Sequence, residues 1–193
     1  MNDPVALGFR IKSGYAVVVA LGGTAHSPVP LGRRLVDLSD PSVHATRQPH
    51  HRETGKEQED AAEISRLTEI IVRSAAKSIA ALLADPALDG RRCAAAGLVV
   101  GSLIDPATVG NPHIRAHASE GRLFRTVVEQ ALHERGVTCQ IHLDRAIASE
   151  ASRTLGLGEE AIKKSVAGWG TTLGQPWRVD EKTAATAAWI ALL

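Results

Sequence analysis

The sequence contains few aromatic residues and no long apolar segment. Only 3% of its 193 residues are aromatic, so its core must be built mainly from the Ala, Val, Leu and Ile that supply most of the 44% hydrophobic content. No apolar run approaches the roughly 20 residues that a membrane-spanning helix needs. The N-terminal Met-Asn-Asp-Pro lacks the basic start and apolar stretch of a signal peptide. We therefore expect a cytoplasmic protein that does not associate with a membrane.

The sequence also has almost no excess of either charge. It contains 22 Lys and Arg residues against 21 Asp and Glu residues, for a formal net charge of +1 at pH 7. A globally basic nucleic-acid-binding domain carries a larger positive excess. Any binding of nucleic acid by this chain would therefore depend on a local basic patch.

Cysteines and histidines are not grouped at the spacing of a metal site. Cys93 and Cys139 each lie in an apolar run and are interpreted as reduced core residues, without a disulfide or metal role. Three histidines fall in a polar segment that we expect to be solvated, whereas metal binding needs fixed spacing on an ordered element: His44, His50 and His51. Four more are scattered: His113, His117, His133 and His142. We therefore predict no metal-binding residue and no cofactor.

Hydrophobic patterning predicts three strands in the N-terminal part of the chain. Residues 5–11 and 15–21 alternate or run apolar at strand length, and Ser13-Gly14 between them favours a tight turn. A third strand is expected at Gly32–Leu38, after a turn region at Pro28-Val-Pro30. Residues 40–58 are polar, with Pro, Gly and Gln, which is typical of an exposed, mobile loop.

The rest of the chain alternates between helical and strand patterns. An apolar stripe at three- and four-residue spacing predicts a long helix over about 59–84. The remaining elements follow in order: a buried strand at 92–100, a helix at 119–135 capped by Gly136, a strand at Val137–Leu143, a helix at Ala146–Leu155 ended by Gly156, a flexible connection at Gly168–Gly174 with Trp169 and Trp177 packed against the domain, and a last helix opened by Asp180.

The predicted order of elements is β-β-β-α-β-α-β-α-α. Three antiparallel strands followed by alternating helices and strands indicate an α/β domain with a mixed sheet. This is the order of the ribonuclease H-like fold, which implies a five-stranded mixed sheet with helices on both faces. The length suits one such domain covering residues 1–193, with the mobile loop at about 40–58.

Four segments of the second half share their order and spacing with one family. They are Leu98-Val-Val-Gly101 before a loop, the helix from Arg115 through Leu132, the segment Ile141-His-Leu-Asp-Arg-Ala-Ile-Ala-Ser-Glu-Ala-Ser-Arg-Thr-Leu155, and Val179-Asp180 opening an Ala-rich terminal helix. Together they resemble the RuvX/YqgF family, whose members are regarded as Holliday-junction resolvases.

The resemblance implies a phosphodiesterase site that has lost part of its metal-binding set. In the family, clustered carboxylates bind Mg²⁺, which activates water and stabilises the leaving oxygen. The match assigns Asp144 and Asp180 as candidate catalytic residues, but places the family's first Asp at Arg10 and its acidic residue after Asp144 at Arg145. Because Mg²⁺ needs hard oxygen ligands, basic groups cannot replace carboxylates. Mg²⁺ is therefore expected only if the chain is a divergent nuclease.

The candidate residues at this centre also have structural interpretations. Asp144 and Asp180 each stand where they could be the N-cap of a helix. Arg10 and Lys12 lie two residues apart and so share one face of their strand. They could reach solvent at the strand end, form an anion site, or, for Arg10, pair with one of the two aspartates where a metal would sit.

Arg115, Arg122 and Arg125 are candidates for a ligand-binding surface near the loop after residue 100. The alternative interpretation of these three residues is an ordinary solvated helix face. The full set of predicted binding residues is Arg10, Lys12, Arg115, Arg122, Arg125 and Arg145.

These observations lead to three hypotheses about function. The first is a degenerate RuvX-like domain that serves as a non-catalytic scaffold or binds nucleic acid or a protein. The second is a divergent metal-dependent nuclease that uses Asp144, Asp180 and a third acid, for which Glu63 and Asp105 are candidates. The third is an actin-like nucleotide-binding domain, although that class also needs an Asp on its first strand.

Overall fold

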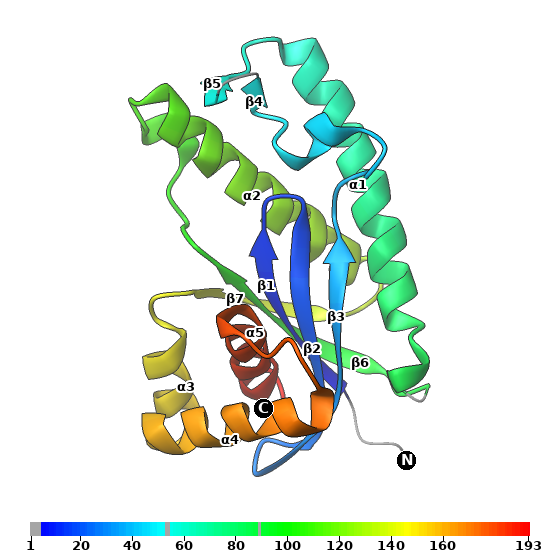
Figure 1. Cartoon of the computed structure of the whole chain (residues 1–193), viewed down its shortest axis with the longest axis vertical. Coiled ribbons are helices and arrows are strands. Elements are labelled where there is room, and N and C mark those ends of the chain that lie inside the picture. The colour runs from blue at the N-terminus through cyan, green and yellow to red at the C-terminus, as the bar shows by residue number, and fades with distance from the viewer. Residues whose placement is uncertain (1–4, 53–54, 89) are drawn as a thin grey trace.

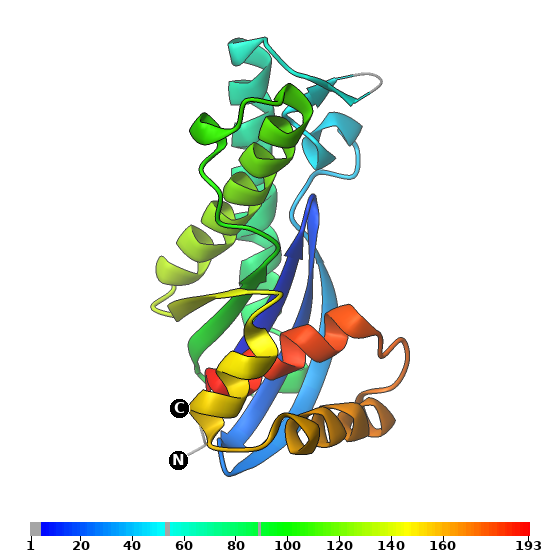
Figure 2. The same ribbon diagram turned by 90° about the vertical axis from the view of Figure 1, so that its left-hand side faces the viewer.

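A mixed β-sheet between two layers of helices forms the centre of the molecule (Figures 1 and 2). The computed structural model describes residues 5–52, 55–88 and 90–193. Within these residues the main sheet has five strands in the order β3-β2-β1-β6-β7. The α/β class and the five-stranded mixed sheet expected from the sequence are confirmed.

The N-terminal strands form an antiparallel meander, and the later strands join it in parallel. β1 pairs antiparallel with β2 and parallel with β6, and β6 pairs parallel with β7. The bounds are β1 Val5–Lys12, β2 Tyr15–Thr24, β3 Ser27–Asp37, β6 Cys93–Val100 and β7 Thr138–Leu143. Apolar residues of β1 and β6 are buried on both faces of the sheet, as the unbroken apolar run at 92–100 predicted.

The third strand begins earlier than expected, because two prolines lie inside it. Pro28 and Pro30 belong to β3 rather than to a turn before it. β3 is at the edge of the sheet, where a residue without an N–H costs no ladder hydrogen bond. The pairing with β2 shifts between Ala20 and Leu21, so that Leu31 is an extra residue in β3.

Two long helices cover one face of the sheet and three shorter helices cover the other (Figure 2). The first layer is α1 (Ala61–Leu83) and α2 (Pro112–His133), and the second is α3 (Ile147–Leu155), α4 (Glu159–Leu173) and α5 (Val179–Ile190). Within the described residues, no helix has both the length and the apolar character needed to cross a membrane.

α2 also begins earlier than predicted, at a proline that the sequence pattern places in a loop. The Asn111 side chain accepts a hydrogen bond from the backbone N–H of Ile114 at 3.1 Å and caps the helix. Pro112 follows at the first helical position, where its missing N–H leaves no bond unmade. The additional turns carry His113 and His117, which the helix predicted from the apolar pattern at 119–135 excluded.

The predicted flexible connection at Gly168–Gly174 is wrong, because most of it belongs to α4. Trp177 packs on this helix and donates a hydrogen bond from Nε1 to the carbonyl of Val166 at 2.9 Å. A Cβ on Gly170 would lie 2.6 Å from the Trp177 ring, so the glycine makes room for the indole. Trp169 packs on Trp189 of α5, with ring centroids 5.1 Å apart.

The described part of the polar segment at 40–58 is mostly exposed, as its composition predicted, but it also contains short regular elements. Its described residues, 40–52 and 55–58, contain a short 3₁₀ helix (His44–Arg47) and the hairpin β4 (His51–Arg52) and β5 (Lys56–Glu57). Thr46 is fully buried, and its hydroxyl donates to the Val43 carbonyl at 2.6 Å. The prediction also covered residues 53–54, which lie outside the described residues.

α5 lies directly on the backbone of the two central strands. A Cβ on Gly8 of β1 would lie 1.8 Å from the Ala184 carbonyl oxygen, and one on Gly97 of β6 would lie 2.7 Å from that of Ala187. The facing side of α5 is rich in alanine, so helix and sheet approach without large side chains between them. This contact sets the height of α5 above β1.

Replacing Gly8 with alanine tests this contact. Because the new methyl group would overlap the backbone of α5, the Gly8→Ala variant should lose about 1–3 kcal/mol of unfolding free energy or more. Gly168→Ala is the matched control, since Gly168 is exposed in α4 and a Cβ added there would meet no neighbouring atom within 4 Å. It should be neutral or slightly stabilising. Equal unfolding curves for the two variants in urea would contradict the close packing of α5.

Candidate functional site

A cleft of about 500 Å³ lies where the end of β1 faces α2. Its walls are residues 10–13, the segment 100–105 after β6, and one side of α2 between residues 117 and 125. Four cationic side chains line it: Arg10, Lys12, Arg122 and Arg125. Asp105 is the acidic residue among those that line it.

Arg10 lies between the two aspartates that the sequence singled out. Its Nη2 donates to Asp144 Oδ2 at 2.6 Å, and its Nε lies 3.6 Å from Asp180 Oδ1. Lys12 Nζ lies 3.1 Å from the same oxygen of Asp180. Arg10 is only 7% exposed, whereas both carboxylates are partly open to solvent. Two cations and two anions therefore form one compact network at the end of β1.

Three different elements bring this network together. Arg10 is in β1, which is paired with β6 up to Val99. Asp144 follows β7, and its backbone N–H donates to the Val100 carbonyl at 2.9 Å, which holds it at the same edge of the sheet. Asp180 is in the first turn of α5. The carboxyl ends of parallel strands meet at one edge, which accounts for Arg10 and Asp144, and the packing of α5 on β1 adds Asp180.

The interpretation of the two aspartates as helix N-caps is wrong. α3 has Ala146 as its N-cap and no side-chain cap, so Asp144 does not cap it. α5 has Arg178 as its N-cap, and the capping carboxylate is Glu181, which accepts from the Arg178 N–H at 2.8 Å. Arg10 does not reach freely into solvent. The pairing of Arg10 with both aspartates is the interpretation that agrees with the geometry.

The residues at this centre do not fit the Mg²⁺ that the resemblance to the RuvX/YqgF family implies. Mg²⁺ is bound by carboxylates and water at about 2.0–2.1 Å in octahedral geometry. Here a guanidinium nitrogen is bonded to Asp144, and Asp180 faces both Arg10 and Lys12. A divalent cation would have to displace these positive groups and would still lack the first carboxylate.

The other predicted binding residues divide into two groups. Arg122 and Arg125 line the cleft; Arg122 is largely exposed and lies 3.5 Å from Asp105. Arg115 does not line it, because it binds Glu57 of β5 through Nε at 2.8 Å and Nη2 at 2.5 Å. Its hydrogen bond lowers the pKa of the Glu57 carboxyl below the ordinary value. Arg145 is exposed and is not among the residues that line the cleft.

The two candidates for a third acid are not placed alike. Glu63 is in α1, where it forms an ion pair with Arg66 at 2.7 Å, and it does not line the cleft. Asp105 does line the cleft, but it faces Arg122. Neither is paired with the network around Arg10.

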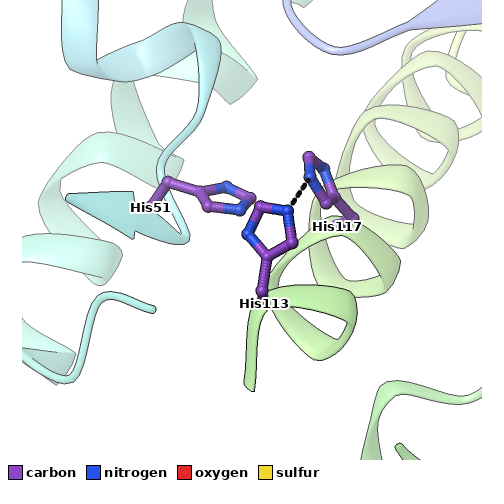
Figure 3. Close-up of side chains that lie close together, drawn as sticks. All are labelled: His51, His113 and His117. Carbon is purple, nitrogen blue, oxygen red and sulfur yellow. Dashed lines mark hydrogen bonds between the residues drawn. The ribbon is translucent and has the colours of Figure 1, made fainter. Parts of the chain in front are cut away.

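A histidine cluster beside the cleft was missed by the sequence analysis. The side chains of His51, His113 and His117 gather where β4 meets the first turns of α2 (Figure 3). His51 is not solvated, since its side chain is only 5% exposed, and His113 and His117 are not scattered. His51 Nδ1 lies 2.7 Å from Glu120 Oε1, and the Glu120 side chain is fully buried. The detectable signal was the spacing of four between His113 and His117, which the predicted helix start concealed.

Burial governs the protonation of this cluster. Desolvation raises the pKa of Glu120, an effect that the hydrogen bond with His51 opposes. Desolvation also lowers the pKa of His117, and the neighbouring His51 and His113 lower it further. The imidazole of His117 is therefore favoured in its neutral form.

Comparison with known proteins identifies the fold. No protein-family model matches the chain, and no curated protein matches its sequence. Among solved structures, RuvC from Thermus thermophilus is similar with a TM-score of 0.52 at 12% identity, over 96% of this chain and 92% of that one. The fold is ribonuclease H-like.

Two further structures show weaker likeness to this ribonuclease H-like domain. One is T. thermophilus RuvC in complex with a Holliday junction substrate, with a TM-score of 0.48 at 12% identity over 97% of this chain and 91% of that one. The other is a Ppx/GppA family member from Aquifex aeolicus, with a TM-score of 0.35 at 12% identity over 77% and 39%. The resemblance to RuvX/YqgF in particular stays a prediction from the sequence motifs.

Removing Arg10 should destabilise the domain. Arg10→Ala leaves Asp144 without its counter-charge and Asp180 with Lys12 alone, and breaking a buried pair costs about 3–5 kcal/mol. Because Asp144 and Asp180 retain 39% and 31% side-chain exposure, water will compensate in part. We expect a loss of roughly 1–3 kcal/mol in chemical denaturation, between the buried and exposed limits. Arg66→Ala is the control, because it removes an exposed ion pair, and it should leave the unfolding free energy nearly unchanged. An equal loss in both variants would contradict the buried network.

The closed network also predicts that Mg²⁺ does not stabilise the native protein. Millimolar Mg²⁺ should leave its melting temperature unchanged, because the cation has no free carboxylate pair to bind. Arg10→Asp is the informative comparison, since it removes the cation and adds the missing oxygen ligand. A rise in melting temperature with Mg²⁺ is expected in that variant only. A rise of the same size in the native protein would overturn this account.

Proposed function

We propose that this ribonuclease H-like domain binds the phosphate backbone of nucleic acid in the cleft and does not cleave it by a Mg²⁺ mechanism. The observation that carries the proposal is the position of Arg10, whose guanidinium occupies the centre between Asp144 and Asp180. The site is thereby changed from one that attracts cations to one that is charge-balanced and unsuited to Mg²⁺. Its carboxylates would then serve to hold Arg10 in place.

The cationic residues of the cleft support an anionic ligand. Arg122 and Arg125 present guanidinium groups from the same side of α2, and Nε of Arg125 is buried without a hydrogen-bond partner among the described residues. Guanidinium groups bind phosphate oxygens with two parallel hydrogen bonds. Such contacts position a nucleic acid without reading its sequence. The local patch agrees with a chain whose overall charge is close to zero.

A binding assay with matched charge variants tests this proposal. Fluorescence anisotropy would compare a four-way DNA junction, a linear duplex and RNA in buffer containing EDTA, at several salt concentrations. The double variant Arg122→Ala/Arg125→Ala should weaken binding about tenfold or more, since hydrogen bonds to charged groups contribute about 1.5–3 kcal/mol each. It should also reduce the slope of log Kd against log salt by about one for each lost phosphate contact.

The control removes the same charge elsewhere. Arg66→Ala/Arg73→Ala changes two exposed arginines of α1 that do not line the cleft, and it should bind as the native protein does.

Equal weakening by both double variants, or no binding at low salt, would refute the proposal and favour a protein-binding scaffold. Mg²⁺-dependent cleavage of the junction that is abolished by Asp144→Asn would instead support the divergent nuclease. Stabilisation by ATP would support the nucleotide-binding alternative.

A further inference from the structure

Three imidazoles from distant parts of the chain converge at the rim of the cleft (Figure 3). His51 is in β4, and His113 and His117 are one turn apart near the start of α2. One ring nitrogen of each lies within 4.8 Å of the corresponding nitrogens of the other two. The Nε2 atoms of His113 and His117 are 3.3 Å apart. Two nitrogens bound to one tetrahedral metal at about 2.0–2.1 Å would be separated by a similar distance, about 3.3–3.4 Å.

Two of the three opposite ring nitrogens have a hydrogen-bond partner, as in metal-binding histidines, and the third faces a carboxylate. His51 Nδ1 is hydrogen-bonded to Glu120 Oε1 at 2.7 Å, and His113 Nδ1 donates to the Gly55 carbonyl at 2.9 Å. His117 Nδ1 lies 3.8 Å from the second oxygen of Glu120. A histidine that binds a metal through one nitrogen usually donates its other N–H to a carboxylate or carbonyl, which fixes the ring and its tautomer. All three rings can therefore turn an Nε2 lone pair towards one point.

Without a cation this arrangement leaves polar groups unsatisfied. His51 is almost fully buried, and its Nε2 has no hydrogen-bond partner among the described residues. The second oxygen of the buried Glu120 is also unpartnered there. The Nε2 atoms of His113 and His117 can form a hydrogen bond only if one of them carries a proton. Neutral His113 already donates from Nδ1 to Gly55, so His117 would have to be the donor. Its Nδ1, which faces Glu120, would then carry no proton. A metal ion would satisfy the three Nε2 lone pairs together.

The hairpin that carries His51 is fixed against α2 independently of the histidines. Arg115 of α2 binds the carboxylate of Glu57 with two hydrogen bonds and also donates to the Val109 carbonyl at 3.1 Å. The contact with Glu57 therefore holds the hairpin against the helix beside the cluster. A site built in this way needs only small side-chain movements to close on an ion.

We propose that His51, His113 and His117 bind a transition-metal ion of the Zn²⁺ class through their Nε2 atoms, with Glu120 as the residue that orients two of the rings. Three nitrogen ligands suit Zn²⁺ or Co²⁺ and leave the fourth tetrahedral position for a water molecule. Mg²⁺ does not suit this site, because it prefers oxygen ligands. His117 also lines the cleft, so the ion would lie at its rim.

Metal titration of the full chain, purified without a polyhistidine tag and stripped with a chelator, tests the proposal. We expect one Zn²⁺ or Co²⁺ per chain, visible Co²⁺ absorption bands of four-coordinate intensity, and a rise in melting temperature that Mg²⁺ does not produce. His113→Ala and His117→Ala should each abolish stoichiometric binding. Both residues are exposed, so the metal-free variants should melt close to the metal-free native protein.

Two further variants make the result specific. His44→Ala changes an exposed histidine of the same polar segment and should bind metal as the native protein does. Glu120→Gln should retain one ion per chain with an affinity lowered about 10–100-fold, as expected for a group that orients the ligands. Absence of Zn²⁺ binding in the native protein, or binding that survives both His113→Ala and His117→Ala, would overturn the proposal.

Discussion

The close contact of α5 with the backbone of β1 and β6 is the constraint on which the rest of the site depends. Gly8 and Gly97 allow the helix to lie against the two central strands without intervening side chains. The first turn of α5 then places Asp180 beside Arg10 and Lys12 of β1. A helix held one side-chain layer further away could not bring its carboxylate to the same network.

Electrostatics at the end of β1 follow from that packing. A cation buried in the central strand of a sheet must be paired, because the loss of hydration is otherwise too costly. Asp144 and Asp180 supply the pairing for Arg10. The same convergence of groups that would bind a metal in an all-carboxylate site here forms an internal ion network. One charge reversal on a strand thus changes which ligands the neighbouring cleft can accept.

Polar contacts connect the segment between β3 and α1 to the rest of the domain. The hairpin β4–β5 is held by the ion pair of Glu57 with Arg115 and by the contact of His51 with the buried Glu120. This hairpin packs against the part of α2 that projects beyond the sheet, near the cleft (Figure 1). The hydrogen bond with His51 offsets part of the desolvation of Glu120, whose pKa is still raised by burial.

The sequence by itself determined the sheet, α1 and α3, because their apolar periods are local and uninterrupted. It also predicted that Asp144 lies at the carboxyl end of its strand, where sites of α/β sheets gather, whereas Asp180 was assigned by the family resemblance and is placed by the packing of α5. Tertiary structure decided the rest. Edge position admits prolines in β3, the Trp177 ring requires Gly170 inside α4, and the docking of the hairpin on α2 joins His51 to His113 and His117. A local pattern cannot specify such features, because each depends on a neighbour that is distant in the chain.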